Sequence, residues 1–159
     1  MSTISFKSIF LSLVLALLLQ ILPWSGNLLI IRPEFILITV LYWILRAPHL
    51  CNIGTAWFAG LIMDLISGGL FGQFALAYVL TAYFAVTYQR RLVLFNVWQQ
   101  AGYVFLLLLF TQVTTLILKL FAGGELPGWE YFLPSISGIL LWQLVSFTRL
   151  GIHHRSGRA

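Results

Sequence analysis

The chain has 159 residues, of which 60% are hydrophobic and only 8% are charged, and its formal net charge is +5. Soluble domains carry roughly one charged residue in four, so this composition argues against a water-soluble fold and predicts an all-α polytopic membrane protein. The basic residues stand singly or in pairs at the ends of apolar runs, which is typical of charges that set membrane topology and not of a nucleic-acid-binding patch.

Six apolar segments follow one another along the chain, and no stretch between them is polar enough to form a separate soluble domain. We therefore expect six transmembrane helices in a single integral membrane domain that covers residues 1–159. Each segment has or approaches the roughly 17 to 25 residues that a helix needs to cross a bilayer. The expected spans are 4–22, 28–45, 53–67, 71–88, 97–120 and 131–150.

Two of these assignments have alternatives. The first segment has Lys7 before its apolar run, as a signal peptide would, but the run is long and lacks a clear small-x-small cleavage site, so a retained anchor is preferred. The third and fourth segments meet at the glycine-rich turn SGGLFG, 67–72. Two full spans are preferred there over a re-entrant hairpin.

The charges predict the orientation of the six spans. Seven of the nine basic residues fall on the side of the two termini, and only Arg32 and Lys119 fall on the other. Three of the four acidic residues, Glu34, Glu125 and Glu130, also fall on that other side. The positive-inside rule then places both termini in the cytoplasm.

Asp64 is a lone carboxylate in an apolar run, and an ionisable residue within a membrane segment suggests a functional site by default. Ala56, Gly60, Asp64 and Gly68 follow one another at intervals of four and so share one face of a helix. Small residues at this spacing let a second helix approach closely. The stripe is expected to pack within the bundle, with contact to a partner's helix or a substrate or proton site as alternatives.

Arg32 and Asp64 are expected at a similar depth on adjacent spans, near the outer face. We expect them to pair, directly or through water, which would offset much of the cost of burying the carboxylate. Deeper in the membrane, Gln112, Thr115 and Gln143 interrupt the last two apolar segments. Hydrogen bonding between helices is the expected role of these three residues, with a polar cavity for a small ligand as the alternative.

No combination of residues predicts catalysis, a metal site or a cofactor. The single cysteine, Cys51, has no second thiol to pair with, and no serine has a histidine or an acid spaced to activate it. No glycine loop of the phosphate-binding type appears either. The sequence therefore favours a protein that is not an enzyme.

Several segments taken together resemble the MreD family, the small inner-membrane proteins of the bacterial rod-shape system. The most specific is NIGTAWFAGLIMDLISGGLFG, 52–72, and the resemblance weakens after about Gln112. The other segments are LLLQILPW (17–24), RPEFILITVLYWIL (32–45) and NVWQQA (96–101).

The resemblance implies a non-enzymatic membrane scaffold of the cell-elongation complex, located in the bacterial inner membrane and without a cofactor. It implies binding to the single-pass protein MreC and a place beside the MreB cytoskeleton, RodZ and the RodA-type peptidoglycan polymerase. It also implies a fold similar to the substrate-binding membrane subunits of vitamin transporters. By that analogy, the alternative function is a transporter-like subunit that binds a small molecule or a lipid precursor, which would need a pocket with convergent polar groups.

Overall fold

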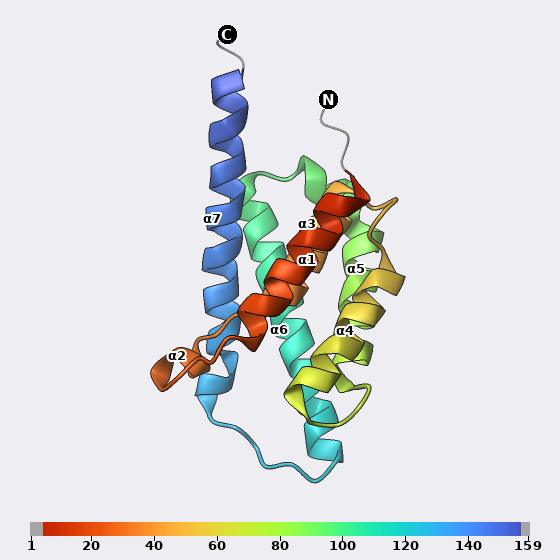
Figure 1. Cartoon of the computed structure of the whole chain (residues 1–159), viewed down its shortest axis with the longest axis vertical. Coiled ribbons are helices and arrows are strands. Elements are labelled where there is room, and N and C mark those ends of the chain that lie inside the picture. The colour runs from red at the N-terminus through yellow and green to blue at the C-terminus, as the bar shows by residue number, and fades with distance from the viewer. Residues whose placement is uncertain (1–4, 157–159) are drawn as a thin grey trace.

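The computed structural model describes residues 5–156, and it describes the side chains of all of these except 93 and 148–156. Within this part of the chain the regular structure is entirely helical, so the predicted all-α fold is confirmed (Figure 1). The elements are α1 (Phe6–Ile21), α2 (Asn27–Ile30), α3 (Phe35–Arg46), α4 (Ile53–Ser67), α5 (Gln73–Leu94), α6 (Val97–Phe121), the 3-10 helix η1 (Trp129–Phe132) and α7 (Leu133–Ser156).

One long helix corresponds to each of the six predicted segments, and α2 is an extra short helix before α3. Among the described residues, two helical stretches are long and apolar enough to cross a membrane: Asn27–Arg46, which α2 and α3 form together, and α6. The helices α1 and α4 are shorter apolar helices. The segments 53–67 and 71–88 correspond to two separate helices, α4 and α5.

Two helices extend further than expected. The predicted fourth span ends at residue 88, but α5 continues to Leu94, so Arg90 and Arg91 lie in its final turns and not in a loop. Basic side chains are favourable there because the carboxyl end of a helix carries a partial negative charge. The last helix continues to Ser156, past the expected end at residue 150.

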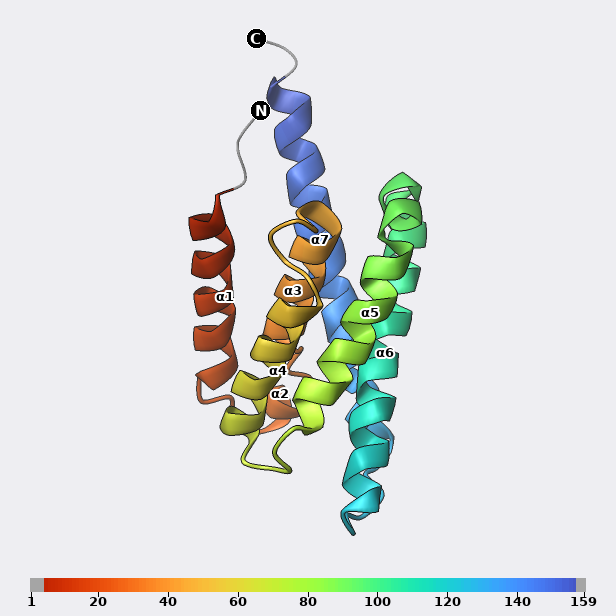
Figure 2. The same cartoon turned by 90° about the vertical axis from the view of Figure 1, so that its right-hand side faces the viewer.

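Successive long helices run in alternate directions, so the start of α1 and the end of α7 lie at the same end of the bundle (Figures 1 and 2). We call this the terminal end, and we call the opposite end, which carries α2, the α4–α5 connection and η1, the loop end. The last turns of α3 and α5, with Arg46 and Arg91, point to the terminal end. Arg158 lies outside the described residues, as do the side chains of Arg149 and Arg155.

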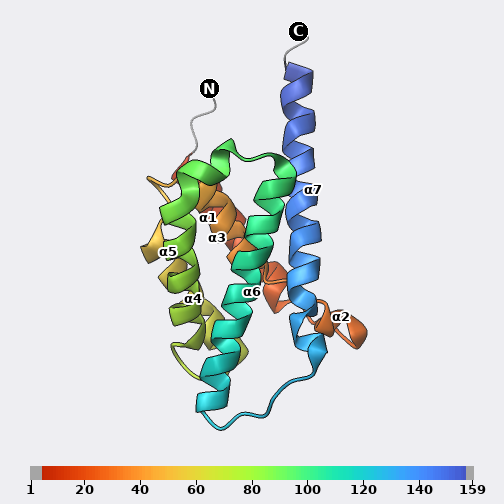
Figure 3. The same cartoon turned by 180° about the vertical axis from the view of Figure 1, so that it is seen from behind.

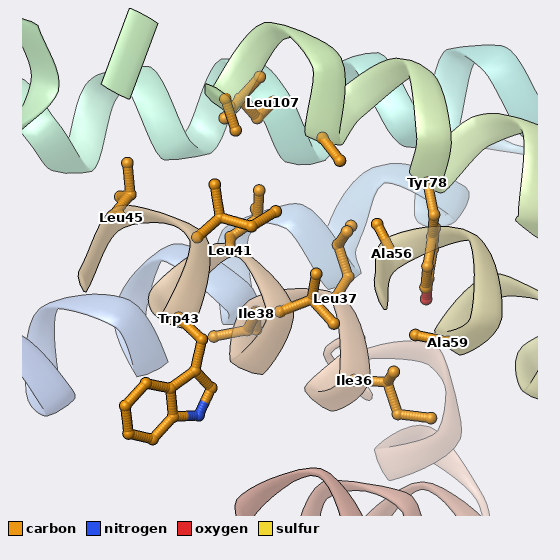
Figure 4. Close-up of a cluster of buried hydrophobic side chains, with 14 of the residues drawn as sticks. Ile36, Leu37, Ile38, Leu41, Trp43, Leu45, Ala56, Ala59, Tyr78 and Leu107 are labelled. Atoms are coloured by element: carbon orange, nitrogen blue, oxygen red, sulfur yellow. The ribbon is translucent and has the colours of Figure 1, made fainter. Parts of the chain in front are cut away.

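The core of the bundle is built around α3. Its Val40, Leu41 and Ile44 are fully buried, and α1, α4, α5 and α7 all pack against this helix. Figure 4 shows the α3 side chains beside residues of the helices around them, including Ala56 and Ala59 of α4, Tyr78 of α5 and Leu107 of α6. The small residues of α4 allow that helix to lie close to its neighbours, and this determines the geometry of the site described next.

Candidate functional site

The carboxylate of Asp64 caps the start of α5. Its Oδ2 accepts hydrogen bonds from the backbone N–H of Gly72 at 2.9 Å and of Ala75 at 3.3 Å, and its Oδ1 accepts one from Phe74 at 2.8 Å. The first N–H groups of a helix have no partner within it, and Gly72, at the N-cap position of α5, has no side chain to supply one. Asp64 therefore neutralises the positive end of α5 from the neighbouring helix.

Gly60 lies one turn before Asp64, at a close approach of α4 to the backbone of α5. A Cβ added to Gly60 would lie 2.5 Å from the Cα of Ala75 and 2.7 Å from the carbonyl oxygen of Phe74. These are backbone atoms and cannot move aside without moving α5. Ala56, one further turn back, is fully buried. Three members of the Ala56–Gly68 stripe thus lie within the bundle.

Gly68 has a different role from the other members of the stripe. It is the C-cap of α4 and adopts the left-handed conformation, with φ of 64°. Nothing lies within 4 Å of the position that its Cβ would take. Gly68 therefore ends the helix and turns the chain, because a residue with a Cβ adopts this conformation only at a cost. It does not contribute to helix packing.

The structure does not bring Arg32 and Asp64 together as an ion pair in the part of the chain that it describes. Arg32 donates a hydrogen bond from Nη1 to the backbone carbonyl of Gln20 at 3.1 Å. The side chain of Gln20 is buried, and its Oε1 accepts from the N–H of Phe35 at the start of α3. Arg32 thus joins the end of α1 to the loop before α3. The carboxylate oxygens of Asp64 instead find their hydrogen-bond donors in the α5 backbone.

Gln112 and Thr115 join α6 to the segment that leads into α7. Gln112 donates from Nε2 to the carbonyl of Tyr131 at 3.2 Å and accepts from the hydroxyl of Ser135. The hydroxyls of Thr115 and Tyr131 lie 2.8 Å apart. These contacts are hydrogen bonds between helices.

Gln143 lies apart from this cluster, on α7. It is half-buried, and its buried Oε1 has no hydrogen-bond partner in the structure.

A further hydrogen bond between helices, which the sequence analysis did not anticipate, joins Glu34 to Tyr78. The Tyr78 hydroxyl donates to the carboxylate of Glu34 at 3.0 Å, and this bond ties the start of α3 to α5.

Two neighbouring cavities at the loop end are lined by several of these polar groups. Their volumes are about 390 Å³ and about 640 Å³, and they share five lining residues: Gln20, Arg32, Met63, Phe74 and Lys119. The ammonium group of Lys119 also lies 5.3 Å from the centre of the Tyr131 ring. The sequence analysis placed Arg32 and Lys119 on one side of the membrane, but it did not predict that they line a common cavity.

Gln73, the first residue of α5, lines the larger cavity. Its side chain is 5% exposed, and its Nε2 is buried without a hydrogen-bond partner. A buried donor without an acceptor costs roughly 1–3 kcal/mol. Gln20 and Gln73 are isolated amides next to apolar runs, and this is the signal by which the sequence could have marked them, as it marked Gln112.

No group of three or more His, Cys, Asp or Glu side chains in the described part of the chain could hold a metal ion. The arrangement of charged and amide groups around the cavity is suited to holding a polar group, and no nucleophile with an activating base lines it.

Comparisons with known proteins identify the relatives of the chain. A family model described as rod shape-determining protein MreD matches residues 1–149. A curated protein named rod shape-determining protein MreD, from Haemophilus influenzae, is 28% identical over 134 residues, which are 83% of this chain and 82% of that protein. No solved structure matches, so the expected similarity to vitamin-transporter subunits stays a prediction.

Proposed function

The chain belongs to the MreD family of rod shape-determining proteins, and we propose that it is a non-enzymatic membrane scaffold of the bacterial cell-elongation machinery. The match of the family model over residues 1–149 carries this proposal. In this function the protein binds MreC and so helps to couple the MreB cytoskeleton, RodZ and the RodA-type polymerase to peptidoglycan synthesis.

The scaffold spans the inner membrane six times as a single domain, with both termini in the cytoplasm. The alternating directions of the six long helices support this topology, since they place the start of α1 and the end of α7 at one end of the bundle. The basic residues at the terminal end support the same orientation through the positive-inside rule. Exposed apolar side chains on the five long helices other than α3 support contact with lipid.

The proposed contact with MreC is made by the outer face of α7. This helix lies at the edge of the bundle beside α6 (Figure 3), and its Ile136, Leu140 and Leu144 are 50%, 67% and 65% exposed. The half-buried Gln143, with its unpaired Oε1, lies beside this face. In a membrane, hydrogen bonds from such amides stabilise the association of helices.

The stripe of Ala56, Gly60 and Asp64 contributes to the scaffold indirectly, by fixing α4 against α5. Replacing Gly60 or Asp64 with leucine is therefore expected to lower the amount of folded protein and, with it, the recovery of MreC. A substitution on the outer face of α7 is expected to lower the recovery of MreC at an unchanged level of folded protein. This difference separates a packing role from a contact role.

Depletion of the protein in its rod-shaped host tests the cellular role. We expect rods to become spheres, and expression of the wild-type chain from a plasmid to restore them. Cells that keep a normal rod shape and a normal rate of elongation after depletion would overturn the proposal.

Site-specific photo-crosslinking tests the proposed contact face. A photoreactive residue at Leu140 or Leu144 is expected to crosslink to MreC, whereas one at Leu11 of α1, which is 71% exposed, is expected not to. Gln143→Leu should lower the recovery of MreC about threefold, which corresponds to the roughly 0.6 kcal/mol of one hydrogen bond between membrane helices. Crosslinks from Leu11 alone would place MreC on another face.

A further inference from the structure

The larger cavity at the loop end is electropositive. Arg32 and Lys119 line it, and no Asp or Glu is among its described lining residues. The smaller cavity that adjoins it is lined by the same two cations but also by Glu34 and Glu130, so its charges are balanced. The two acids thus line only the smaller cavity, and the described lining of the larger one holds Arg32 and Lys119 without an acid, which favours an anion there.

The buried amide of Gln73 is a second and independent sign of a ligand. Gln73 lines this electropositive cavity, and its Nε2 is buried without an acceptor. The protein supplies no acceptor for this donor, and a rotation of the side chain towards the cavity would let an oxygen of a bound anion supply one. Arg32 offers a guanidinium group, whose planar set of N–H donors matches the oxygens of a phosphate or a carboxylate.

An apolar groove lies next to this cavity along α1 and α4. The groove has a volume of about 620 Å³ and lies between α1 and α4, with Ile36 of α3 also lining it. Leu17 of α1 and Ile62 of α4 line the groove, and Ile21 and Ile66, about one turn further along each helix, line the cavity. From Phe6 to Leu17 the groove follows α1 for about 16 Å, at 1.5 Å per residue.

We propose that the groove and the cavity together bind a membrane lipid with an anionic phosphate headgroup. The headgroup lies between Arg32, Lys119 and Gln73, and an acyl chain lies in the groove between α1 and α4. The two parts complement the two halves of such a lipid, because the cations meet the phosphate while the apolar groove meets the chain. A hydrophobic partner helix would supply no counter-charge for the two cations and no acceptor for Gln73, and a free phosphate ion would leave the groove without an occupant.

Binding is measured on the full chain in an uncharged detergent by native mass spectrometry. The probes are dioleoyl phosphatidylglycerol, dioleoyl phosphatidylcholine, which has the same chains but no net charge, and inorganic phosphate. We expect one phosphatidylglycerol to bind at least tenfold more tightly than phosphatidylcholine. We also expect inorganic phosphate to fail to displace it at equal concentration.

Two headgroup variants test the polar part of the site. Lys119→Gln should weaken phosphatidylglycerol binding about tenfold, the loss expected for one charge-assisted contact. Gln73→Leu should weaken binding while leaving the thermal stability of the lipid-free protein unchanged or raised, because it removes an unpaired buried amide. Arg90→Gln with Arg91→Gln removes two cations at the terminal end and should leave binding unchanged.

A pair of tryptophan variants on α4 tests the groove. Ile62→Trp places a larger side chain in the groove and should weaken lipid binding. Leu65→Trp is the matched control, because Leu65 is 72% exposed and does not line the groove. Equal affinity for the two lipids, or unchanged binding in both Lys119→Gln and Gln73→Leu, would overturn the proposal. Displacement of the lipid by an equal concentration of inorganic phosphate would show a site for the free ion and would also overturn it.

Discussion

Gly60 is the position where the structure makes its sharpest prediction about stability. The change to test is Gly60→Ala, which adds one methyl group to the middle of α4. That methyl carbon would lie 2.5 Å from the Cα of Ala75, 2.7 Å from the carbonyl oxygen of Phe74 and 2.8 Å from the nitrogen of Ala75. Every one of these neighbours is a backbone atom, so no side-chain rotation can relieve the contact.

The expected loss follows from these distances. Carbon atoms in contact are separated by roughly 3.5 Å, so α4 and α5 must move apart by about 1 Å at this point. Overpacking of this kind costs about 1–3 kcal/mol, and alanine in place of glycine returns roughly 1 kcal/mol through its higher helix propensity. The same movement stretches the hydrogen bonds of Asp64, which are 2.8–3.3 Å long, and hydrogen bonds to charged groups contribute about 1.5–3 kcal/mol. The net result is a loss of about 2–3 kcal/mol.

The assay is reversible unfolding of the purified chain in detergent micelles, followed by circular dichroism. Gly102→Ala in α6 is the matched control, because nothing lies within 4 Å of the position that its Cβ would take. The control is expected to stabilise the protein by about 0.5–1 kcal/mol. If Gly60→Ala were also neutral or stabilising, the close approach of α4 to the α5 backbone would be refuted.

Three further predictions concern individual polar groups. Asp64→Ala should destabilise the fold by about 2–3 kcal/mol and Asp64→Asn by less, because asparagine keeps one acceptor for the α5 backbone; equal losses in unfolding experiments would refute the cap. In a double-mutant cycle, Arg32→Ala and Asp64→Ala should add to within about 0.5 kcal/mol, because the two side chains have different partners, and a coupling above about 1 kcal/mol would instead indicate an ion pair. Cys51 is fully buried, and burial raises the pKa of its thiol to about 11. A maleimide reagent near neutral pH should therefore leave Cys51 unlabelled until the protein is unfolded, whereas labelling of the native protein at the rate of a free thiol would contradict its burial.

The helices could be predicted from the sequence because the signals that begin and end them are local. Asn52 and Asn96 each cap a helix beside an apolar run, and the glycines of the 68–72 turn separate α4 from α5. Each of these end signals lies within a few residues of the apolar run whose length predicts the helix. The two ends that differed lie past charged residues: α5 continues beyond Arg90 and Arg91 to Leu94, and α7 continues into the polar tail to Ser156, so the end of an apolar run does not mark the end of the helix there.

The partners of the polar groups could not be predicted in the same way. The spacing of Gly60 and Asp64 shows that they share a helix face, but it carries no information about what lies opposite that face. The groups opposite are the backbone N–H groups of α5, which every residue except proline possesses, so no residue type marks them in the sequence. Arg32 was paired with Asp64 on charge and depth alone, whereas the structure directs it to the carbonyl of Gln20.

The same α4–α5 contact also determines the geometry of the proposed lipid site. Gln73 is the first residue of α5, and Asp64 binds the N–H groups of Gly72 and Phe74 on either side of it. Asp64 therefore positions Gln73, which lines the cavity, although Asp64 is not itself among the lining residues.

This arrangement predicts a difference between two substitutions. Asp64→Asn should lower both the stability of the lipid-free protein and its affinity for phosphatidylglycerol, because the start of α5 loses part of its anchor. Gln73→Leu should lower the affinity alone. The measurements are unfolding in detergent and native mass spectrometry on the same preparations. An Asp64→Asn protein with reduced stability and full lipid affinity would show that the cap supports the fold without positioning the cavity wall.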